Sequence, residues 1–137
     1  MGTSSVVKIC DFGNGCFFDV LINVIQTRQY RSPEVILGID YDTSADMWSF
    51  VCMIFELITG DYLFDPRSGD GYNKEDDHLA YVTELIGHPD KDYILSGSRS
   101  RKYYTTKGKL KRIKKHERWS LFDVLYDKYK FKKQEAK

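Results

Sequence analysis

The spacing of apolar side chains predicts a long buried helix in the first half of the chain. It runs from Ser44 to Ile58, with Thr43 as N-cap, Asp46 in a capping-box-like position and Gly60 as terminator. Apolar residues occupy nearly every side of it: Met47, Trp48, Phe50, Val51, Met53, Ile54, Phe55, Leu57 and Ile58. Because no wide polar face remains, we expect other elements to cover this helix.

A second predicted helix, Glu75 to Ile86, has one apolar and one acidic face. Its apolar stripe consists of Leu79, Val82, Leu85 and Ile86. Asp77 and Glu84 are seven residues apart and therefore return to one polar face at about 3.6 residues per turn. Gly87 and Pro89 follow and end the helix.

The remaining segments predict short elements and loops. A mostly β-branched run, Val6–Cys10, suits a short strand. Residues 61–74 form a turn-rich loop, and the polar, basic segment 96–118 is expected to be irregular. A short helix from Leu121 to Tyr129 follows. We therefore predict a mainly α fold in a single unit over residues 1–137.

Composition bounds the class of protein. At 137 residues and 42% hydrophobic content, the chain has the size and apolar fraction of one globular domain. Its cysteines, Cys10, Cys16 and Cys52, have no metal-ligand spacing, and an odd number without a secretory signal suggests reduced thiols in an intracellular compartment. No apolar run approaches membrane-spanning length, so no membrane partner is expected.

The net charge of +1 conceals two oppositely charged parts. Residues 1–98 hold 6 Lys and Arg against 16 Asp and Glu, whereas residues 99–137 hold 15 against 4. An acidic surface of this density favours a cationic partner. Alternatively, the two parts neutralise one another in the fold, or each is merely solvated surface, and charge alone does not decide between these readings.

Three motifs occur in the order typical of the C-terminal lobe of a protein kinase: Asp11-Phe12-Gly13, Ser32-Pro33-Glu34 and Asp46-Met47-Trp48-Ser49. Asp-Phe-Gly alone is more typical of an ordinary turn at the end of a strand, but the second motif begins 19 residues after Gly13, and the third follows it. The Gly-rich phosphate loop, the Val-Ala-Ile-Lys strand and the His-Arg-Asp catalytic loop do not occur in the sequence. We therefore expect catalysis to require parts outside this chain, including the general base.

The chain resembles one branch of these enzymes, the SR protein kinases, which phosphorylate serines in the Arg/Ser-rich segments of splicing factors. The resemblance lies in Ile25-Gln26-Thr27-Arg28-Gln29-Tyr30-Arg31-Ser32, Thr59-Gly60-Asp61-Tyr62-Leu63-Phe64, Glu75-Asp76-Asp77-His78 and Trp119-Ser120-Leu121-Phe122-Asp123-Val124-Leu125. It implies a partial kinase C-terminal lobe with a short strand, an activation segment, a buried central helix, an acidic docking helix, a basic insert and a short C-terminal helix. It also implies a location in the cytoplasm and nucleus.

The resemblance implies roles near the reaction centre. Asp11-Phe12-Gly13 would belong to the ATP site, with Asp11 binding Mg²⁺ through a hard carboxylate oxygen. Thr27, Arg28, Gln29 and Arg31 would contact the substrate beside its acceptor serine. Arg28 and Arg31 would meet phosphate already placed on the substrate, a ligand suited to guanidinium groups. The alternative for these arginines is a structural ion pair.

Asp61, Asp77, Glu84 and Lys128 fall where the family docks Arg-rich substrate away from the reaction centre. Helical spacing supports part of this independently, because Asp77 and Glu84 share a face in the most acidic stretch. Exposed ion pairs contribute about 0.2–1 kcal/mol each, so docking should sum several pairs and be sensitive to salt. The alternative is a plain solvated helix face. Lys74 stands where family members carry arginine, which weakens any bidentate phosphate contact there.

Glu34, Asp46 and Trp48 have structural roles by the same resemblance. Asp46 would accept hydrogen bonds from the catalytic loop, and Glu34 would pair with an arginine in the helices that close the lobe. Neither partner occurs in the sequence. A carboxylate buried without its partner costs several kcal/mol, so we predict marginal stability for this chain alone.

Three functions remain open. The first is a portion of a serine/threonine kinase that transfers the ATP γ-phosphate to Arg/Ser-rich proteins. This chain alone would be inactive and would bind neither ATP nor Mg²⁺ tightly. The second is a non-catalytic docking module for the same proteins. In either case the partners are Arg/Ser-rich proteins and, if a larger product exists, the missing kinase segments. The third and least favoured is RNA binding by the Lys-rich run 107–115 with Tyr103 and Tyr104. Ser98-Arg99-Ser100-Arg101 is either an autophosphorylation site or part of a basic loop.

Overall fold

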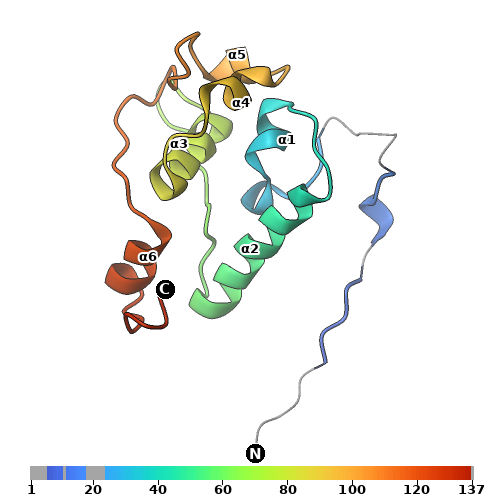
Figure 1. The fold of residues 1–137 in the computed structure, drawn as a ribbon, viewed down its shortest axis with the longest axis vertical. Helices are drawn as coiled ribbons and strands as arrows, with labels where there is room; N and C mark the ends of the chain where they lie inside the picture. Colours follow the sequence, from blue (N-terminus) through green and yellow to red (C-terminus); the bar gives the residue numbers. More distant parts are fainter. Residues whose placement is uncertain (1–5, 11, 18–23, 137) are drawn as a thin grey trace, which may run out of the picture.

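The computed structural model describes residues 6–10, 12–17 and 24–136. Its α-helices are α1 (Pro33–Leu37), α2 (Ser44–Thr59), α3 (Lys74–Ile86), α4 (Lys91–Ser96), α5 (Ser100–Tyr103) and α6 (Leu121–Asp123), arranged as in Figure 1. Short turns add η1 (Phe12–Asn14), η2 (Arg28–Tyr30) and the π-helical η3 (Val124–Lys128). The described residues form no strand, only the isolated bridges Gly69–Tyr72 and Tyr104–Leu110. The prediction of a mainly α fold is confirmed.

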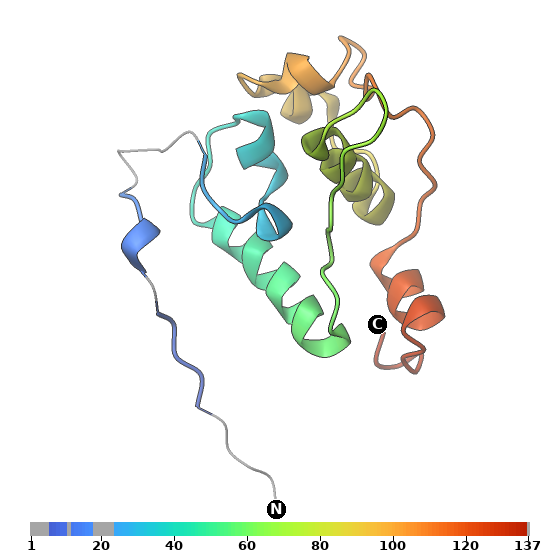
Figure 2. The same cartoon turned by 180° about the vertical axis from the view of Figure 1, so that it is seen from behind.

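The strand predicted over Val6–Cys10 is wrong. This stretch has no regular structure, and its side chains are exposed, with Val7 at 88%. Residues 6–10 lie apart from the helical body in both views (Figures 1 and 2), whereas Cys16 Sγ lies 3.8 Å from the Tyr41 hydroxyl. A strand needs a neighbouring segment to satisfy its backbone N–H and C=O groups. Within the described part of the chain, no such neighbour lies beside it.

Helix α2 begins at its predicted first residue and extends one residue beyond its predicted end, but its predicted N-cap is wrong. It ends at Gly60, whose left-handed backbone (φ +80°) is the conformation that glycine adopts at helix ends. Thr43 has helical backbone angles and makes no side-chain cap among the described residues. Instead, the Asp42 carboxylate accepts the Ser44 N–H at 2.8 Å. The capping box predicted for this helix is therefore wrong.

The prediction that α2 is covered on all sides is also wrong. Its buried residues are Ala45, Cys52 and Phe55. Apolar side chains on its other sides are exposed: Met47, Phe50, Val51, Met53, Ile54, Leu57 and Ile58. An apolar pattern indicates that a helix is stabilised by burial, but it does not show which other elements cover the helix. The described residues cover one side of α2 only.

Helix α3 is confirmed, with one residue added at its start. Asn73 caps it, and a reciprocal capping box links the side chains and N–H groups of Asn73 and Asp76 at 3.0 Å each. Leu79 and Val82 are buried as predicted, whereas Ile86 is 53% exposed and lies outside the packed stripe.

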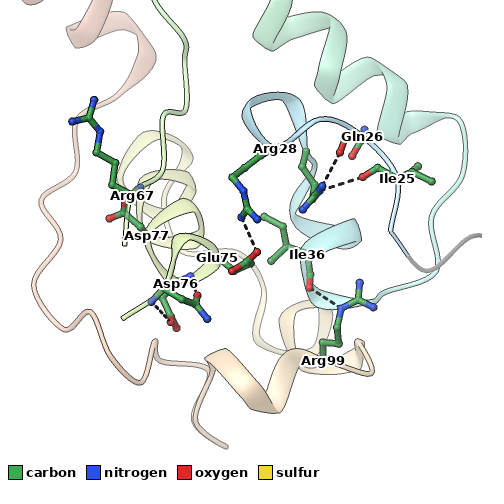
Figure 3. Close-up of polar contacts among 11 residues, drawn as sticks. Ile25, Gln26, Arg28, Ile36, Arg67, Glu75, Asp76, Asp77 and Arg99 are labelled. Carbon is green, nitrogen blue, oxygen red and sulfur yellow. Dashed lines mark hydrogen bonds and ion pairs between the residues drawn. The ribbon is translucent and has the colours of Figure 1, made fainter. Parts of the chain in front are cut away.

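The basic segment is more ordered than predicted. It contains helix α5. Helix α4, which ends where this segment begins, was also missed, although Asp90 accepts the N–H groups of its first turn, a signal that the sequence carried. Arg99 donates to the carbonyl of Ile36 at 3.1 Å and so joins the segment to the end of α1 (Figure 3). Ser100 is fully buried, which makes the autophosphorylation reading wrong for this residue.

Three apolar clusters join the helices. One lies between α1, α3, α4 and α5 and contains Leu37, Leu79 and Tyr104. A second joins α2 to α3 through Cys52, Phe64 and Val82. The third packs Phe55 of α2 against Leu125, so it holds the predicted C-terminal helix, now seen as α6 and η3. None of the described helices combines the length and apolarity needed to cross a lipid bilayer.

Candidate functional site

Gln26 fastens the start of the 27–31 loop to α2. Its backbone is left-handed (φ +68°), a conformation that is uncommon for a residue with a side chain. Its amide nitrogen donates to the Ala45 carbonyl at 2.6 Å and the Ser49 hydroxyl at 2.9 Å. Its amide oxygen accepts the Ser32 N–H at 2.9 Å. These three bonds hold the unusual backbone and clamp the two ends of the loop.

Both arginines of the 27–31 loop have protein partners. Arg28 forms an ion pair with Glu75 of α3, with Nη1 and Oε1 2.7 Å apart (Figure 3). Arg31 donates to the carbonyls of Ile25 at 3.2 Å and Gln26 at 2.8 Å. Arg28 therefore forms the structural ion pair that was the alternative for these arginines. Arg31 instead forms hydrogen bonds with the backbone carbonyls of Ile25 and Gln26. The side chain of Arg28 is 32% exposed.

The other residues of the loop have different surroundings. Thr27 is exposed, and Gln29 is half-buried in η2. The Tyr30 hydroxyl donates to Glu56 of α2 at 2.5 Å. This hydrogen bond, followed by burial, raises the pKa of Tyr30 to about 12. The loop and α2 are thus joined at Tyr30 as well as at Gln26.

The predicted docking carboxylates of α3 lie together. Tyr81 stands between Asp77 and Glu84, and both charges, after the larger effect of burial, raise the pKa of its hydroxyl. Asp77 accepts the N–H of Arg67 at 2.8 Å (Figure 3), and Glu84 accepts the N–H of Glu117. Partial burial raises the pKa of Glu84, so it loses its charge at a higher pH than an ordinary glutamate.

Asp61 and Lys128 form the second part of the predicted groove. Lys128 Nζ lies 3.5 Å from Asp61 Oδ2, and the Tyr129 hydroxyl donates to the same oxygen at 2.7 Å. That hydrogen bond is the main cause that lowers the pKa of Asp61, which therefore keeps its charge at neutral pH. Asp61 and Lys128 line a cavity of about 430 Å³ together with Glu56, Gly60, Tyr62 and Asp65.

The two parts are connected by residues that sequence reasoning missed. Asp65 pairs with Arg67 at 2.9 Å, and the Arg67 N–H is the one that Asp77 accepts. We call Asp61, Asp65, Asp77 and Glu84 the acidic face. The density of acids between residues 61 and 92 was a signal for Asp65, but nothing local indicated which acids share a surface.

The predicted metal ligand cannot be placed. Asp11 lies outside the described residues, and its neighbours Phe12 and Gly13 form part of η1, with Phe12 75% exposed. Among the residues that the structure describes, no group of three or more His, Cys, Asp or Glu side chains is arranged to hold a metal ion.

The three predicted structural residues have mixed outcomes. Trp48 is half-buried and stacks on Phe64, with ring centroids 5.6 Å apart. Asp46 is exposed, so its predicted burial is wrong, because α2 is covered on one side only. Glu34 accepts a hydrogen bond from the Tyr93 hydroxyl at 3.2 Å, so the prediction that it lacks a partner is also wrong. Asp46 and Glu34 therefore do not support the predicted marginal stability, whereas the exposed apolar side chains of α2 are consistent with it.

His78 is expected to destabilise the fold as the pH falls below 7. Its imidazole is 1% exposed and packs against Phe64, with ring centroids 5.0 Å apart. Burial, followed by the charges of Arg28 and Arg31, lowers its pKa to about 4. Between this value and the ordinary one near 6.5, the unfolded chain binds a proton that the native chain does not. As the pH is lowered through this window, the free energy of unfolding therefore decreases, by at most roughly 3 kcal/mol.

Urea unfolding at neutral pH and at about pH 5 measures this effect. In His78→Leu the loss of stability between the two pH values should be clearly smaller than in the unaltered chain. His88→Leu, a matched change at an exposed position, should leave the pH dependence as it is. Equal pH dependence in His78→Leu and the unaltered chain would show that another group is responsible.

Comparisons with known proteins bear on this arrangement. A family model described as "Protein kinase domain" matches residues 1–130. The chain is 53% identical over 133 residues to the serine/threonine-protein kinase SRPK of Physarum polycephalum, covering 96% of this chain and 31% of that protein. It is 55% identical over 126 residues to protein kinase dsk1 of Schizosaccharomyces pombe, covering 91% and 23%. It is 44% identical over 131 residues to SRSF protein kinase 3 of Homo sapiens, covering 95% and 23%.

The chain thus spans less than a third of the length of these curated relatives. The matches extend through the 27–31 loop and the acidic face, since they cover nearly all of this chain. The chain belongs to the protein kinase domain family, in its SR protein kinase branch.

Proposed function

We propose that this chain is the substrate-reading part of a serine/threonine protein kinase that acts on Arg/Ser-rich proteins such as splicing factors. One observation carries the proposal: the acidic face, on which α3 presents Asp77 and Glu84 while Asp61 and Asp65 line the neighbouring cavity. By the same family resemblance, we expect this chain to work in the cytoplasm and nucleus.

The acidic face recognises arginine through charge and geometry. A guanidinium donates two parallel hydrogen bonds to one carboxylate, which a lysine ammonium cannot do. Each exposed pair contributes about 0.2–1 kcal/mol, so successive arginines must engage several carboxylates for useful affinity. Lys128 beside Asp61 and Arg67 beside Asp65 hold these acids in place until arginines of the ligand compete for them.

The 27–31 loop reads the segment that follows. Arg28 is held by Glu75 and remains about a third exposed, so it is available to a phosphate already placed on the substrate. Arg31 contributes by holding the backbone of Ile25 and Gln26, and this shapes the loop. Lys74 begins α3, next to Glu75, and adds a point charge without the bidentate geometry of arginine.

In the complete enzymes of this family, ATP and Mg²⁺ supply the phosphoryl group and neutralise its charge. Asp11, to which the family resemblance assigns Mg²⁺, lies outside the described residues, and those residues include no cluster arranged to hold a metal ion. The steps assigned to this chain are therefore binding and orientation of the substrate.

Titration of the chain with a labelled peptide of Arg-Ser repeats tests the proposal. Saturable binding is expected, and a Lys-Ser peptide of equal length and charge should bind several-fold more weakly because it lacks the bidentate geometry. Equal affinity for the two peptides would reduce the acidic face to a non-specific negative surface. Absence of binding would overturn the assignment.

A non-catalytic docking module is the second candidate, favoured by one observation: every member of the acidic face lies in this chain, whereas the catalytic loop sequence does not. The intact mass of the native product separates the two candidates. A product much heavier than 16.0 kDa supports the kinase reading, and a stable product of 16.0 kDa supports the module. RNA binding is less favoured still. Tyr103 and Tyr104 are only 2% and 1% exposed, so they cannot stack on bases.

A further inference from the structure

The first turn of α3 contacts three different segments of the chain. Its three consecutive acids each have a separate partner, drawn in part in Figure 3. Glu75 pairs with Arg28 of the 27–31 loop at 2.7 Å. Asp77 accepts the backbone N–H of Arg67, in the loop that carries Asp61 and Asp65, at 2.8 Å. The third acid, Asp76, reaches the basic segment.

Asp76 is tied to the basic segment by Arg112. Arg112 Nη1 lies 2.9 Å from Asp76 Oδ1 and 3.3 Å from Oδ2, and it also donates to the carbonyl of Lys102 at 3.1 Å. Asp76 is only 2% exposed, and its Oδ2 also accepts the Asn73 N–H of the capping box. A buried carboxylate of this kind depends on its cation, because no solvent replaces a lost partner.

Three consecutive residues of one helical turn move together, since their backbone is shared. A displacement of Asp76 would therefore shift Glu75, which holds Arg28, and Asp77, which belongs to the acidic face. Burial raises the pKa of Glu75, but the Arg28 hydrogen bond and, more weakly, the charge of Lys102 lower it, so that the net shift is downward. The basic segment thus lies close to Glu75 as well as to Asp76.

We propose that Arg112 is a positioning residue that acts through Asp76 on the first turn of α3. It holds Asp77 where the acidic face meets an Arg-rich ligand, and it holds Glu75 where Arg28 is fixed. This inference rests on the proposed docking function of the acidic face, and it adds a residue from the basic segment to that function.

Simple electrostatics and positioning predict opposite results for Arg112. Arg112 is a cation close to an acidic surface, so as a mere charge it repels an Arg-rich peptide, and its removal should raise the affinity. As a positioning residue it should lower the affinity when removed. Lys109 provides the matched control, because it is exposed on the same segment and contacts Thr105 through backbone groups.

The test compares Arg112→Ala with Lys109→Ala in the full chain, using the Arg-Ser peptide as probe. Arg112→Ala should weaken binding by about tenfold, a coupling of ordinary size between linked sites, and Lys109→Ala should leave it equal or tighter. Arg112→Lys should restore part of the affinity, because a point charge reaches Asp76 without also bonding Lys102. Affinity in Arg112→Ala equal to or tighter than in Lys109→Ala would overturn the proposal.

A second variant distinguishes a loss of docking from a loss of folding. Asp76→Asn with Arg112→Ala leaves no buried charge, keeps a side-chain oxygen for the Asn73 N–H and should show the same loss of affinity. Amide hydrogen exchange supplies a readout independent of docking. Faster exchange at residues 26–31 as well as 73–78 is expected in both variants, and a change confined to 73–78 would overturn the coupling. If the unaltered chain binds no peptide, the proposed function fails, and the exchange result still decides the role of Arg112.

Discussion

Reversing the charge of two carboxylates on α3 should abolish binding of an Arg-Ser peptide. In Asp77→Lys with Glu84→Lys, two attractions are replaced by two repulsions on one helix face. At about 1–1.5 kcal/mol per reversed site, the affinity falls roughly 100-fold. Fluorescence anisotropy with a labelled peptide measures the effect at about 0.1 M salt, where the Debye length is about 10 Å.

A variant with the same change in net charge separates local docking from global attraction. Asp40→Lys with Asp92→Lys alters two exposed acids that lie outside the acidic face. We expect its affinity to stay within about threefold of that of the unaltered chain, because charges beyond a Debye length are largely screened. A loss as large as in the α3 variant would mean that net charge alone governs binding.

Replacing Phe64 with alanine should unfold the chain or come close to it. Phe64 is 2% exposed, stacks on Trp48 of α2 and packs against His78 of α3. Removal of a buried phenylalanine costs about 3–5 kcal/mol, which approaches the whole stability of a small domain. Because α2 leaves much apolar surface exposed, we place this chain at the low end of that range. Urea unfolding followed by circular dichroism measures the loss.

Phe50 allows the same substitution on the uncovered side of α2. It is 49% exposed, so Phe50→Ala should change the free energy of unfolding by no more than about 1 kcal/mol. Similar losses for Phe50→Ala and Phe64→Ala would contradict the packing described here, in which α2 buries one side only. A cooperative, stable Phe64→Ala variant would contradict it as well.

Local signals in the sequence account for most of the helical fold. The bounds of α2 and α3 follow from apolar spacing and from Gly60 and Gly87, because these signals act within a few residues. The same local periodicity predicts that Asp77 and Glu84 share one face of α3. Helix α4 was missed although Asp90 carried a local signal for its start.

Apart from the N-cap of α2 and the missed helix α4, the contacts that the sequence did not predict join residues that lie far apart along the chain. The Arg28–Glu75 pair joins residues 47 apart, and the Arg112–Asp76 pair joins residues 36 apart. No periodicity specifies such contacts, since they depend on how helices pack. The prediction that other elements cover α2 was wrong for a related reason. A fully apolar helix indicates a need for cover, and the covering elements are not a property of the helix itself.

The affinity of the unaltered chain for the Arg-Ser peptide, measured at two salt concentrations, tests the central claim most directly. If the acidic face docks arginines by summing exposed ion pairs, binding should be saturable and should weaken by at least about tenfold between roughly 50 mM and 500 mM salt. Affinity that is independent of salt, or absent at low salt, would contradict the claim that this chain reads Arg-rich substrates through Asp61, Asp65, Asp77 and Glu84.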